Sequence, residues 1–286
     1  MLRVQKDQAA GLRRASSEDF DSPLPPRRRA RTEGARMIAI TSGKGGVGKT
    51  QIAANLAVAM AQAGQRVLVI DADLGLASLD LALGLSPEHD LQDVIAGDKT
   101  IDEVLVEGPS GVQLLPACPG RYEAANMGAR ERMVLTEAIE SVADRFDVVL
   151  IDTGAGIGSN AVAFAALADE IVLVTTPDPT SLRDSYAMAK VLNRRTGIRR
   201  IQLVANQVGS EVEGISIHEK LDMIVRRFLT LELAYLGCVP RDDQVRESVA
   251  AGNPFVLRAP RSHATRALHG VVRRLSPTTE PRSVLC

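Results

Sequence analysis

The segment Gly43–Thr50, which reads GKGGVGKT, constrains the fold of this 286-residue chain more than any other feature. It fits the phosphate-loop pattern G-x-x-x-x-G-K-[ST], with the fixed positions at Gly43, Gly48, Lys49 and Thr50. An apolar run at 37–41 precedes it, and residues 51–63 follow with apolar side chains at helical spacing. In such a strand–loop–helix unit, backbone N–H groups converge on phosphate oxygens and the helix N-terminus adds a favourable dipole. The sequence therefore predicts a nucleotide site, with a purely structural glycine turn as the alternative.

The loop positions have separate expected roles. Lys49 is placed to reach the β- and γ-phosphates, and the Thr50 hydroxyl to ligate Mg²⁺. Lys44 cannot easily fold back onto phosphates that its own loop encloses, so a solvated surface lysine is its simplest interpretation. The expected nucleotide contacts are Gly43, Lys44, Gly45, Gly46, Val47, Gly48, Lys49, Thr50 and Gln51.

With its second lysine, the loop resembles the deviant Walker A loop of the ParA/MinD family of ATPases, and the resemblance covers about residues 37–275. It implies ATP and Mg²⁺ as cofactors and a slow, partner-regulated hydrolysis of ATP to ADP and phosphate. It also implies an ATP-dependent homodimer, in which Lys44 crosses the interface and touches the nucleotide of the facing subunit. Lys44 and Lys49 are therefore counted among the expected catalytic residues.

Two carboxylates follow the apolar run at 67–70, at the end of a strand where ligands bind in parallel sheets. The family resemblance assigns Asp73 to orienting the attacking water and Asp71 to supporting the metal. Without a phosphate loop in the same chain, two acids capping a turn would be an acceptable alternative.

The segment 147–158, DVVLIDTGAGIG, contains another buried-type strand that ends at Asp152, as a Walker B strand does. Asp152 is expected to hold Mg²⁺ through water, and the glycine-rich residues 153–158 to form a switch loop that senses the γ-phosphate. The Thr-Gly-Ala-Gly after the aspartate looks like the flagellar branch of the family, the FlhG (or FleN) proteins, rather than the MinD branch.

The resemblance places the adenine at the far end of the sheet. An asparagine after one strand and the loop after the next hold the base in the family, which points to Asn206 and Pro240. Pro240 is also explained as a residue that ends a strand.

Alternating strands and helices predict an α/β fold with a doubly wound, mostly parallel sheet flanked by helices on both faces, of the MinD-like P-loop NTPase type. The predicted strands are 37–41, 67–71, 112–115, 147–151, 170–175, 200–205 and 233–239. The predicted helices are 50–63, 122–144, 159–167, 179–196, 216–229, 242–250 and 263–275.

Composition excludes several classes of protein. The net charge of −1 argues against strong affinity of the whole chain for DNA. No stretch of about 18 apolar residues and no secretory signal is present, which indicates a cytoplasmic protein, either free or peripheral at the inner membrane or cell pole. The scattered Cys118, Cys238 and Cys286 fit a reducing compartment and oppose an iron–sulfur carrier, which needs paired cysteine ligands.

The N-terminal 36 residues differ from the rest of the chain. Residues 16–36 are rich in proline and arginine and are expected to be a flexible linker before the ATPase domain at 37–275. Residues 1–15 contain D-Q-A-x-x-L-R, which matches the activator segment of FlhG proteins, a short helix that docks on the signal-recognition-type GTPase FlhF. The expected partner-binding residues are Asp7, Gln8, Ala9, Leu12 and Arg13, with Gln8 helping to order the catalytic water of the partner.

The C-terminal segment departs from the MinD pattern. Residues 263–275 have an apolar stripe opposed by arginines, and a helix packed on the sheet explains this pattern better than a membrane-binding helix. Residues 276–286 contain two prolines, cannot continue the helix and are expected to be a disordered tail. Contact with a membrane is therefore left open.

The resulting hypothesis is an ATPase switch that regulates flagellar number or placement through an FlhF-type GTPase, with flagellar C-ring proteins and a flagellar transcription activator as further partners. One alternative is a ParA-type ATPase that positions a chromosome, plasmid or other cargo, for which Arg194, Arg195, Arg199 and Arg200 would be the nearest DNA-binding face. A second alternative is a switch that binds ATP and hydrolyses it negligibly.

Overall fold

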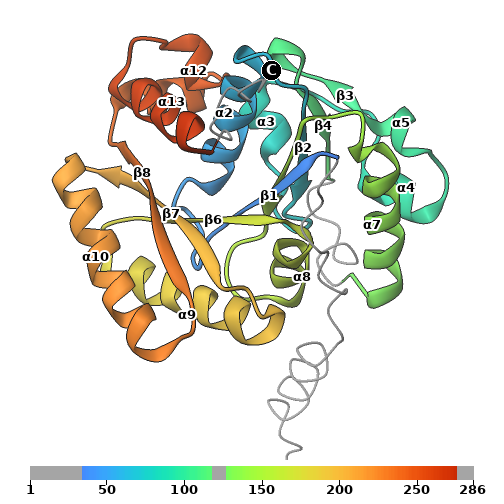
Figure 1. Ribbon diagram of the computed structural model, residues 1–286. Helices are drawn as coiled ribbons and strands as arrows, with labels where there is room; N and C mark the ends of the chain where they lie inside the picture. The colour runs from blue at the N-terminus through green and yellow to red at the C-terminus, as the bar shows by residue number, and fades with distance from the viewer. Residues whose placement is uncertain (1–33, 118–126, 276–286) are drawn as a thin grey trace, which may run out of the picture.

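Strands and helices alternate along the chain in a computed structural model that describes residues 34–117 and 127–275 (Figure 1). Within these residues eight strands form one sheet in the order β3-β4-β2-β5-β1-β6-β7-β8. Their bounds are β1 Arg36–Thr41, β2 Val67–Ala72, β3 Val106–Glu107, β4 Gln113–Leu115, β5 Val148–Thr153, β6 Glu170–Thr175, β7 Arg200–Val208 and β8 Glu232–Pro240. All neighbours pair in parallel except β3 and β4. The predicted α/β class with a mostly parallel sheet is confirmed.

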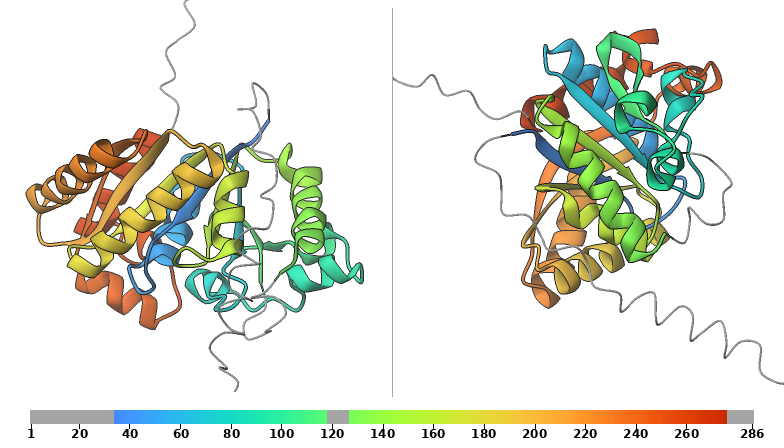
Figure 2. Two further views of the ribbon diagram at one scale, coloured as in Figure 1. Left: turned by 90° about the horizontal axis from the view of Figure 1, so that it is seen from below. Right: turned by 90° about the vertical axis from the view of Figure 1, so that its right-hand side faces the viewer.

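Helices cover both faces of this sheet because consecutive strand residues point to opposite sides (Figures 1 and 2). On β1, Ile38 and Ile40 face one apolar layer, and Met37 and Ala39 face the other. The first layer contains α2 (Lys49–Gln62), α3 (Leu79–Leu83), α12 (Phe255–Arg258) and α13 (His263–Leu275). The second contains α4 (Leu91–Ala96), α5 (Ile101–Val104), α7 (Ala129–Ala143), α8 (Ser159–Leu167), α9 (Pro179–Thr196) and α10 (Glu211–Phe228). A single turn, η1 (Pro109–Gly111), and helix α11 (Asp243–Ala250) complete the described elements.

All seven predicted strands are present, and the differences from prediction concern short elements and helix ends. The helix predicted at 216–229 begins earlier, at Glu211, because the Ser210 hydroxyl accepts a hydrogen bond from the Glu213 N–H and caps the helix. The helix predicted at 122–144 is observed from Ala129, and residues 118–126 lie outside the described part. The missed elements β3, α3, α4, α5 and α12 have two to six residues, too few to show a period in sequence.

The outer strand β8 is irregular. Leu203 of β7 pairs with Tyr235, but the next residue, Val204, pairs with Gly237, so that Leu236 forms a bulge. The Leu236 carbonyl accepts a hydrogen bond of 2.8 Å from the Arg274 guanidinium of α13. The last strand is therefore tied to the last described helix by a side chain.

The apolar stripe of α13 is occupied in this fold. Leu268, Val271 and Leu275 are buried against the layer that contains α2, as predicted from the sequence. No helix among the described residues is long and apolar enough to span a bilayer. The predicted segments at 1–15 and 276–286, and most of the predicted linker at 16–36, lie outside the described residues.

Candidate functional site

Two glycines of the loop between β1 and α2 lie where a side chain has no room. A Cβ atom on Gly43 would lie 2.1 Å from the backbone carbonyl of Asp184, because α9 packs directly against the loop. Gly48 caps α2 with a φ of 85°, and a Cβ atom there would lie 2.4 Å from the Asn206 amide nitrogen. The sequence motif is thus explained by close approach as well as by backbone conformation.

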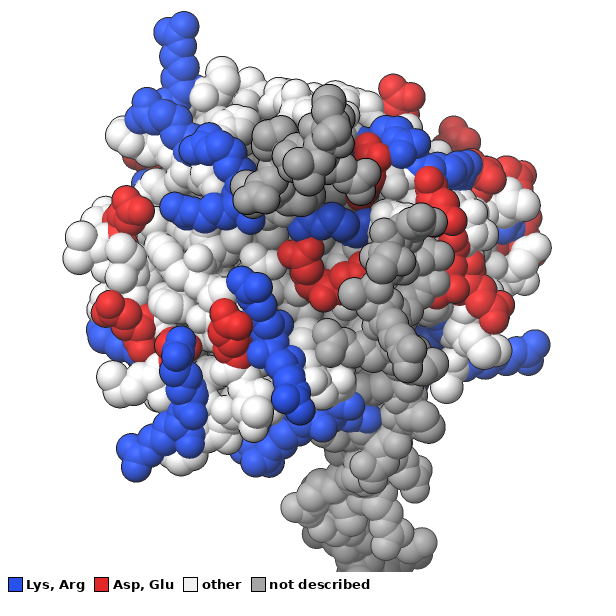
Figure 3. All heavy atoms as spheres, in the orientation of Figure 1, with Lys and Arg blue, Asp and Glu red and all other residues white. Residues whose placement is uncertain are grey.

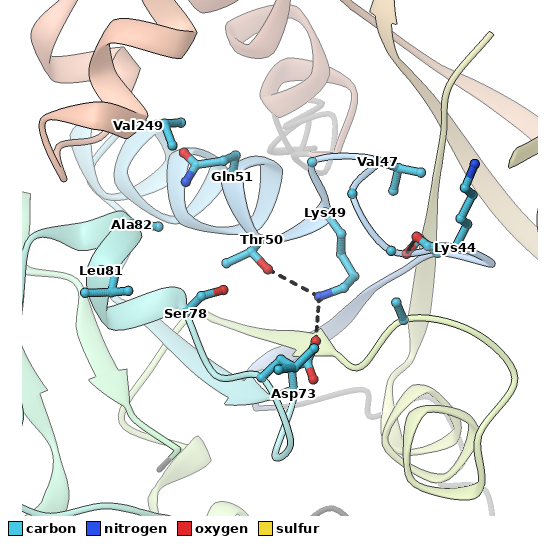
Figure 4. A pocket seen from close by; sticks show the side chains of 16 residues that line it. Lys44, Val47, Lys49, Thr50, Gln51, Asp73, Ser78, Leu81, Ala82 and Val249 are labelled. Carbon is cyan, nitrogen blue, oxygen red and sulfur yellow. Dashed lines mark hydrogen bonds and ion pairs between the residues drawn. The ribbon is translucent and has the colours of Figure 1, made fainter. Parts of the chain in front are cut away.

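A cavity of about 470 Å³ opens over this loop, within the size range of ligand sites (Figure 4). Residues 44–51 of the predicted loop line it, together with Asp73. The residues that the sequence analysis missed are Ser42, Leu76, Ser78, Leu81, Ala82, Ala155 and Val249. Gly43, Asp71 and Asp152 do not line the cavity, although they were predicted as site residues.

Lys49 and Asp152 form a buried ion pair at the base of the loop. The Lys49 ammonium lies 2.8 Å from Oδ1 of Asp152, 3.4 Å from the Thr50 hydroxyl and 3.9 Å from Oδ2 of Asp73. Burial raises the pKa of Asp152, and the adjacent Lys49 charge opposes that rise. Oδ2 of Asp152 is buried with no hydrogen-bond partner among the described residues. A buried carboxylate oxygen with spare acceptor capacity beside a hydroxyl suits a divalent cation with its water.

Asp71 is engaged with the backbone of the following loop. Its Oδ1 accepts from the Asp73 N–H, and its Oδ2 accepts from the N–H groups of Ser78 and Leu79, each at 3.0 Å. Burial, with the nearby Asp152 charge, raises the pKa of Asp71 to about 7. These contacts hold the loop that carries Asp73, and the role of Asp71 near a metal stays a prediction.

Asp73 is partly exposed and faces the cavity, as expected for a residue that meets water (Figure 4). A Cβ atom on Gly154 would lie 3.6 Å from its Oδ1, so the predicted switch loop passes close to this carboxylate. The structure thus brings Asp73, Lys49 and the start of the switch loop together.

Lys44 projects away from Lys49, on the other side of the loop (Figure 4). Its ammonium donates to Oδ2 of Asp178 at 2.8 Å and to the Thr180 hydroxyl at 2.6 Å. Asp178 also caps α9 by accepting from the Thr180 N–H. The Lys44 hydrogen bond, with that from Thr180, lowers the pKa of Asp178 to about 2. In this chain alone, Lys44 is held by the first turn of α9.

A second cavity, of about 460 Å³, adjoins the first and shares Gly48, Gln51 and Val249 with it. Asn206 and Pro240, the predicted adenine residues, both line it. The Asn206 amide donates a 2.7 Å hydrogen bond to the Val47 carbonyl, which leaves its own carbonyl oxygen as an acceptor. An acceptor suits the exocyclic amine of adenine and repels the carbonyl of guanine.

Gln207 also lines this second cavity and was not identified from the sequence. It has a φ of 58° and lies between the paired residues Asn206 and Val208, where β7 shifts register against β8. Such a bulge has no signature in a single sequence, and bulges are frequent beside binding sites.

The phosphate loop at the carboxyl end of β1, beside the buried acid that ends β5, defines a P-loop nucleotide hydrolase. The ParA family model, described as NUBPL iron-transfer P-loop NTPase, matches residues 34–276. The chain is 41% identical over 240 residues to the antiactivator FleN of Pseudomonas aeruginosa, covering 84% of this chain and 86% of FleN. It is 35% identical to the flagellum site-determining protein YlxH of Helicobacter pylori, covering 75% and 72%.

Solved structures agree with these relatives. The septum site-determining protein MinD of Pyrococcus horikoshii, complexed with Mg-ADP, superposes with a TM-score of 0.71 at 28% identity, covering 85% of this chain and 96% of MinD. The chain belongs to the ParA/MinD family of P-loop ATPases, in its FlhG/FleN branch. The predicted partner-binding residues Asp7, Gln8, Ala9, Leu12 and Arg13 lie outside the described residues.

Replacing Asn206 with aspartate should weaken nucleotide binding by at least about tenfold, because a carboxylate cannot donate to the Val47 carbonyl and adds negative charge beside the loop. Equilibrium titration with a fluorescent ATP analogue measures the change. Asn253→Asp, at an exposed position, is the matched control. Equal affinities for the Asn206→Asp protein and the wild type would show that the asparagine does not support the loop.

Proposed function

We propose that this chain is an ATP-dependent, dimerising ATPase switch that regulates flagellar number or placement. The observation that carries the proposal is the cluster of Lys49, Asp73 and Asp152 beside the phosphate loop, in a chain similar to FleN and to a flagellum site-determining protein. The carbonyl of Asn206, an acceptor that suits the amine of adenine, supports ATP as the nucleotide.

The proposed chemistry uses residues that already lie together. Thr50 and Asp152 would hold Mg²⁺, which supplies positive charge to the phosphate oxygens, and Asp71 would support them from behind. When the nucleotide binds, the Lys49 ammonium would leave Asp152 and bind a phosphate oxygen. Asp73 would accept a hydrogen bond from the attacking water and so orient it. The glycine-rich loop after Asp152 passes near Asp73 and senses the γ-phosphate.

Lys44 supplies the proposed link between nucleotide and dimer. Its ammonium lies outside its own loop and is bound to the start of α9, at a partly exposed position that a facing subunit can reach. On ATP binding it would exchange Asp178 for the nucleotide of the partner subunit. In the single chain Lys44 is bound to Asp178, so dimer formation requires Lys44 to give up that ion pair.

The proposed partner is an FlhF-type GTPase, reached through residues 1–15. The support is the D-Q-A-x-x-L-R match in the sequence together with the flagellar name of YlxH. The antiactivator name of FleN supports an activator as a further partner, and the sequence resemblance makes it a flagellar transcription activator and adds flagellar C-ring proteins. The cytoplasmic location inferred from the sequence stays a prediction.

Asp73→Ala should reduce ATP turnover by at least about a hundredfold while ATP affinity stays within about threefold, because phosphate and metal contacts remain and only water orientation is lost. Phosphate release and equilibrium ATP binding measure the two effects. Lys49→Ala should instead lose ATP binding. Wild-type turnover in purified Asp73→Ala protein would sink the assignment.

Lys44→Ala should leave ATP binding to the monomer largely intact and remove the ATP-dependent dimer, because the crossing contact is lost. Light scattering in an Asp73→Ala background, where ATP is not consumed, reports the mass. If the double variant still doubles its mass with ATP, Lys44 is only a surface lysine.

A peptide of residues 1–20 should stimulate GTP hydrolysis by a cognate FlhF-type protein on its own, and Gln8→Ala should remove the effect because alanine cannot align water. The full chain that carries Asp73→Ala should still stimulate GTP hydrolysis by the partner. GTP turnover unchanged at saturating peptide would make the motif match a coincidence and favour a ParA-type cargo mover, which has no reason to show either effect.

A further inference from the structure

Helix α10 exposes large apolar side chains. Val212 is 76% exposed, Met223 70% and Phe228 60%, and Ile215 and Ile224 are exposed as well. Another face of the helix is already satisfied, because Ile217, Leu221 and Val225 are buried in the core. This helix therefore carries exposed apolar side chains that the described part of the chain does not cover.

The spacing of these residues forms a seam along the helix. Val212 and Ile215 are three residues apart, and Met223 lies eight residues further on, so all three fall within an arc of about 80° at 3.6 residues per turn. Ile224 and Phe228 lie about 100° or more round the helix from Met223, at the edge of the buried face, and are not part of this seam. Such a seam is typical of a surface that packs against another helix.

Charge divides the same helix into two halves. The N-terminal half carries Glu211, Glu213 and Glu219, and the C-terminal half carries Lys220, Arg226 and Arg227 against one acid, Asp222. A parallel copy would place like charges together, whereas an antiparallel copy places each acidic half against a basic half. A two-fold contact requires this kind of self-complementarity, because the same patch serves both subunits.

Several of these charges have no partner of opposite sign in the part of the chain that the structure describes. Arg226 is paired with Asp222 at 2.6 Å, but Glu219, Lys220 and Arg227 make no ion pair with any other residue in the described ranges. The Arg227 guanidinium lies 5.3 Å from the centre of the Phe228 ring, at the basic end of the helix. Both signs are therefore available to a second molecule.

The seam lies away from the candidate nucleotide site. Helix α10 covers the flank beside β7 and β8, and both charge signs are visible along that flank (Figures 1 and 3). No residue of α10 lines either cavity of the site. A contact through α10 thus leaves the phosphate loop and Lys44 free.

We propose that α10 is a self-association surface through which two copies of this chain pair antiparallel about a two-fold axis. A single-helix seam belongs to the small class of interfaces, below about 1,200 Å² in total, so the pairing is weak and reversible. One consequence rests on the proposed function: if the ATP-dependent dimer also forms, two different two-fold contacts on each chain link the dimers into open chains. The α10 pairing itself needs no nucleotide.

Sedimentation velocity of the nucleotide-free full chain over a concentration series tests the pairing, which should appear as a reversible monomer–dimer equilibrium. Glu211→Lys with Glu219→Lys makes the helix predominantly basic, and Lys220→Glu with Arg227→Glu makes it predominantly acidic. Each double variant alone should associate at least about tenfold more weakly, because like charges then meet. An equimolar mixture of the two should recover association, since opposite seams face each other.

Met223→Asp should weaken pairing by placing a charge in the apolar seam, and Met133→Asp, at a 57% exposed position on α7, should leave the mass unchanged. Thermal unfolding midpoints close to that of the wild type show that the variants fold. If the wild-type chain is a monomer at every concentration, the proposal is overturned. That result is expected if α10 binds a lipid surface or another protein instead of a second copy. Association that persists in both charge variants overturns it too. Lys44→Ala leaves the α10 seam intact, so this variant can lose the ATP-dependent dimer and still pair through α10. The two proposals therefore fail independently.

Discussion

The buried contact between Lys49 and Asp152 is the interaction on which the site depends. Either charge alone, enclosed where β1 and β5 end, would carry a large desolvation penalty, and neither would keep its position. The same ammonium lies 3.9 Å from Oδ2 of Asp73, so Lys49 faces two carboxyl groups. Its position thus links the strand that carries Asp152 to the loop that carries Asp73.

The start of α9 contacts the phosphate loop through two separate features. Its backbone at Asp184 touches Gly43, and its capping residue Asp178 holds Lys44. A change in the loop is therefore transmitted to this helix by close backbone contact as well as by an ion pair. Because the packing at Gly43 leaves no room for a Cβ atom, small movements there cannot be absorbed locally.

Much of the fold and of the site could be predicted from the sequence, for physical reasons that differ between residues. The phosphate loop and the acids at the carboxyl ends of β2 and β5 stand at fixed offsets from continuous apolar runs, so local sequence determines where they lie. The residue that holds Lys44, Asp178, is 134 positions away and becomes a neighbour only when the sheet forms. The rim residues Leu76 and Val249 likewise come from separate loops and carry no chemical signature.

Asn206 shows a second limit of prediction from sequence motifs. Its place near the base was expected, but its hydrogen bond to the Val47 carbonyl is a property of the folded chain. The bulge that turns Gln207 toward the same cavity depends on how β7 meets β8, which no single strand encodes.

The bulge at Leu236 affects how the chain behaves in a crowded solution. An outer strand with a regular row of free N–H and C=O groups is a template onto which another chain can add a strand. In β8 that row is broken, and one of its carbonyls is already occupied by Arg274. Strand addition at this edge is therefore disfavoured, and the chain can carry exposed apolar side chains elsewhere with less risk of growing into a fibre.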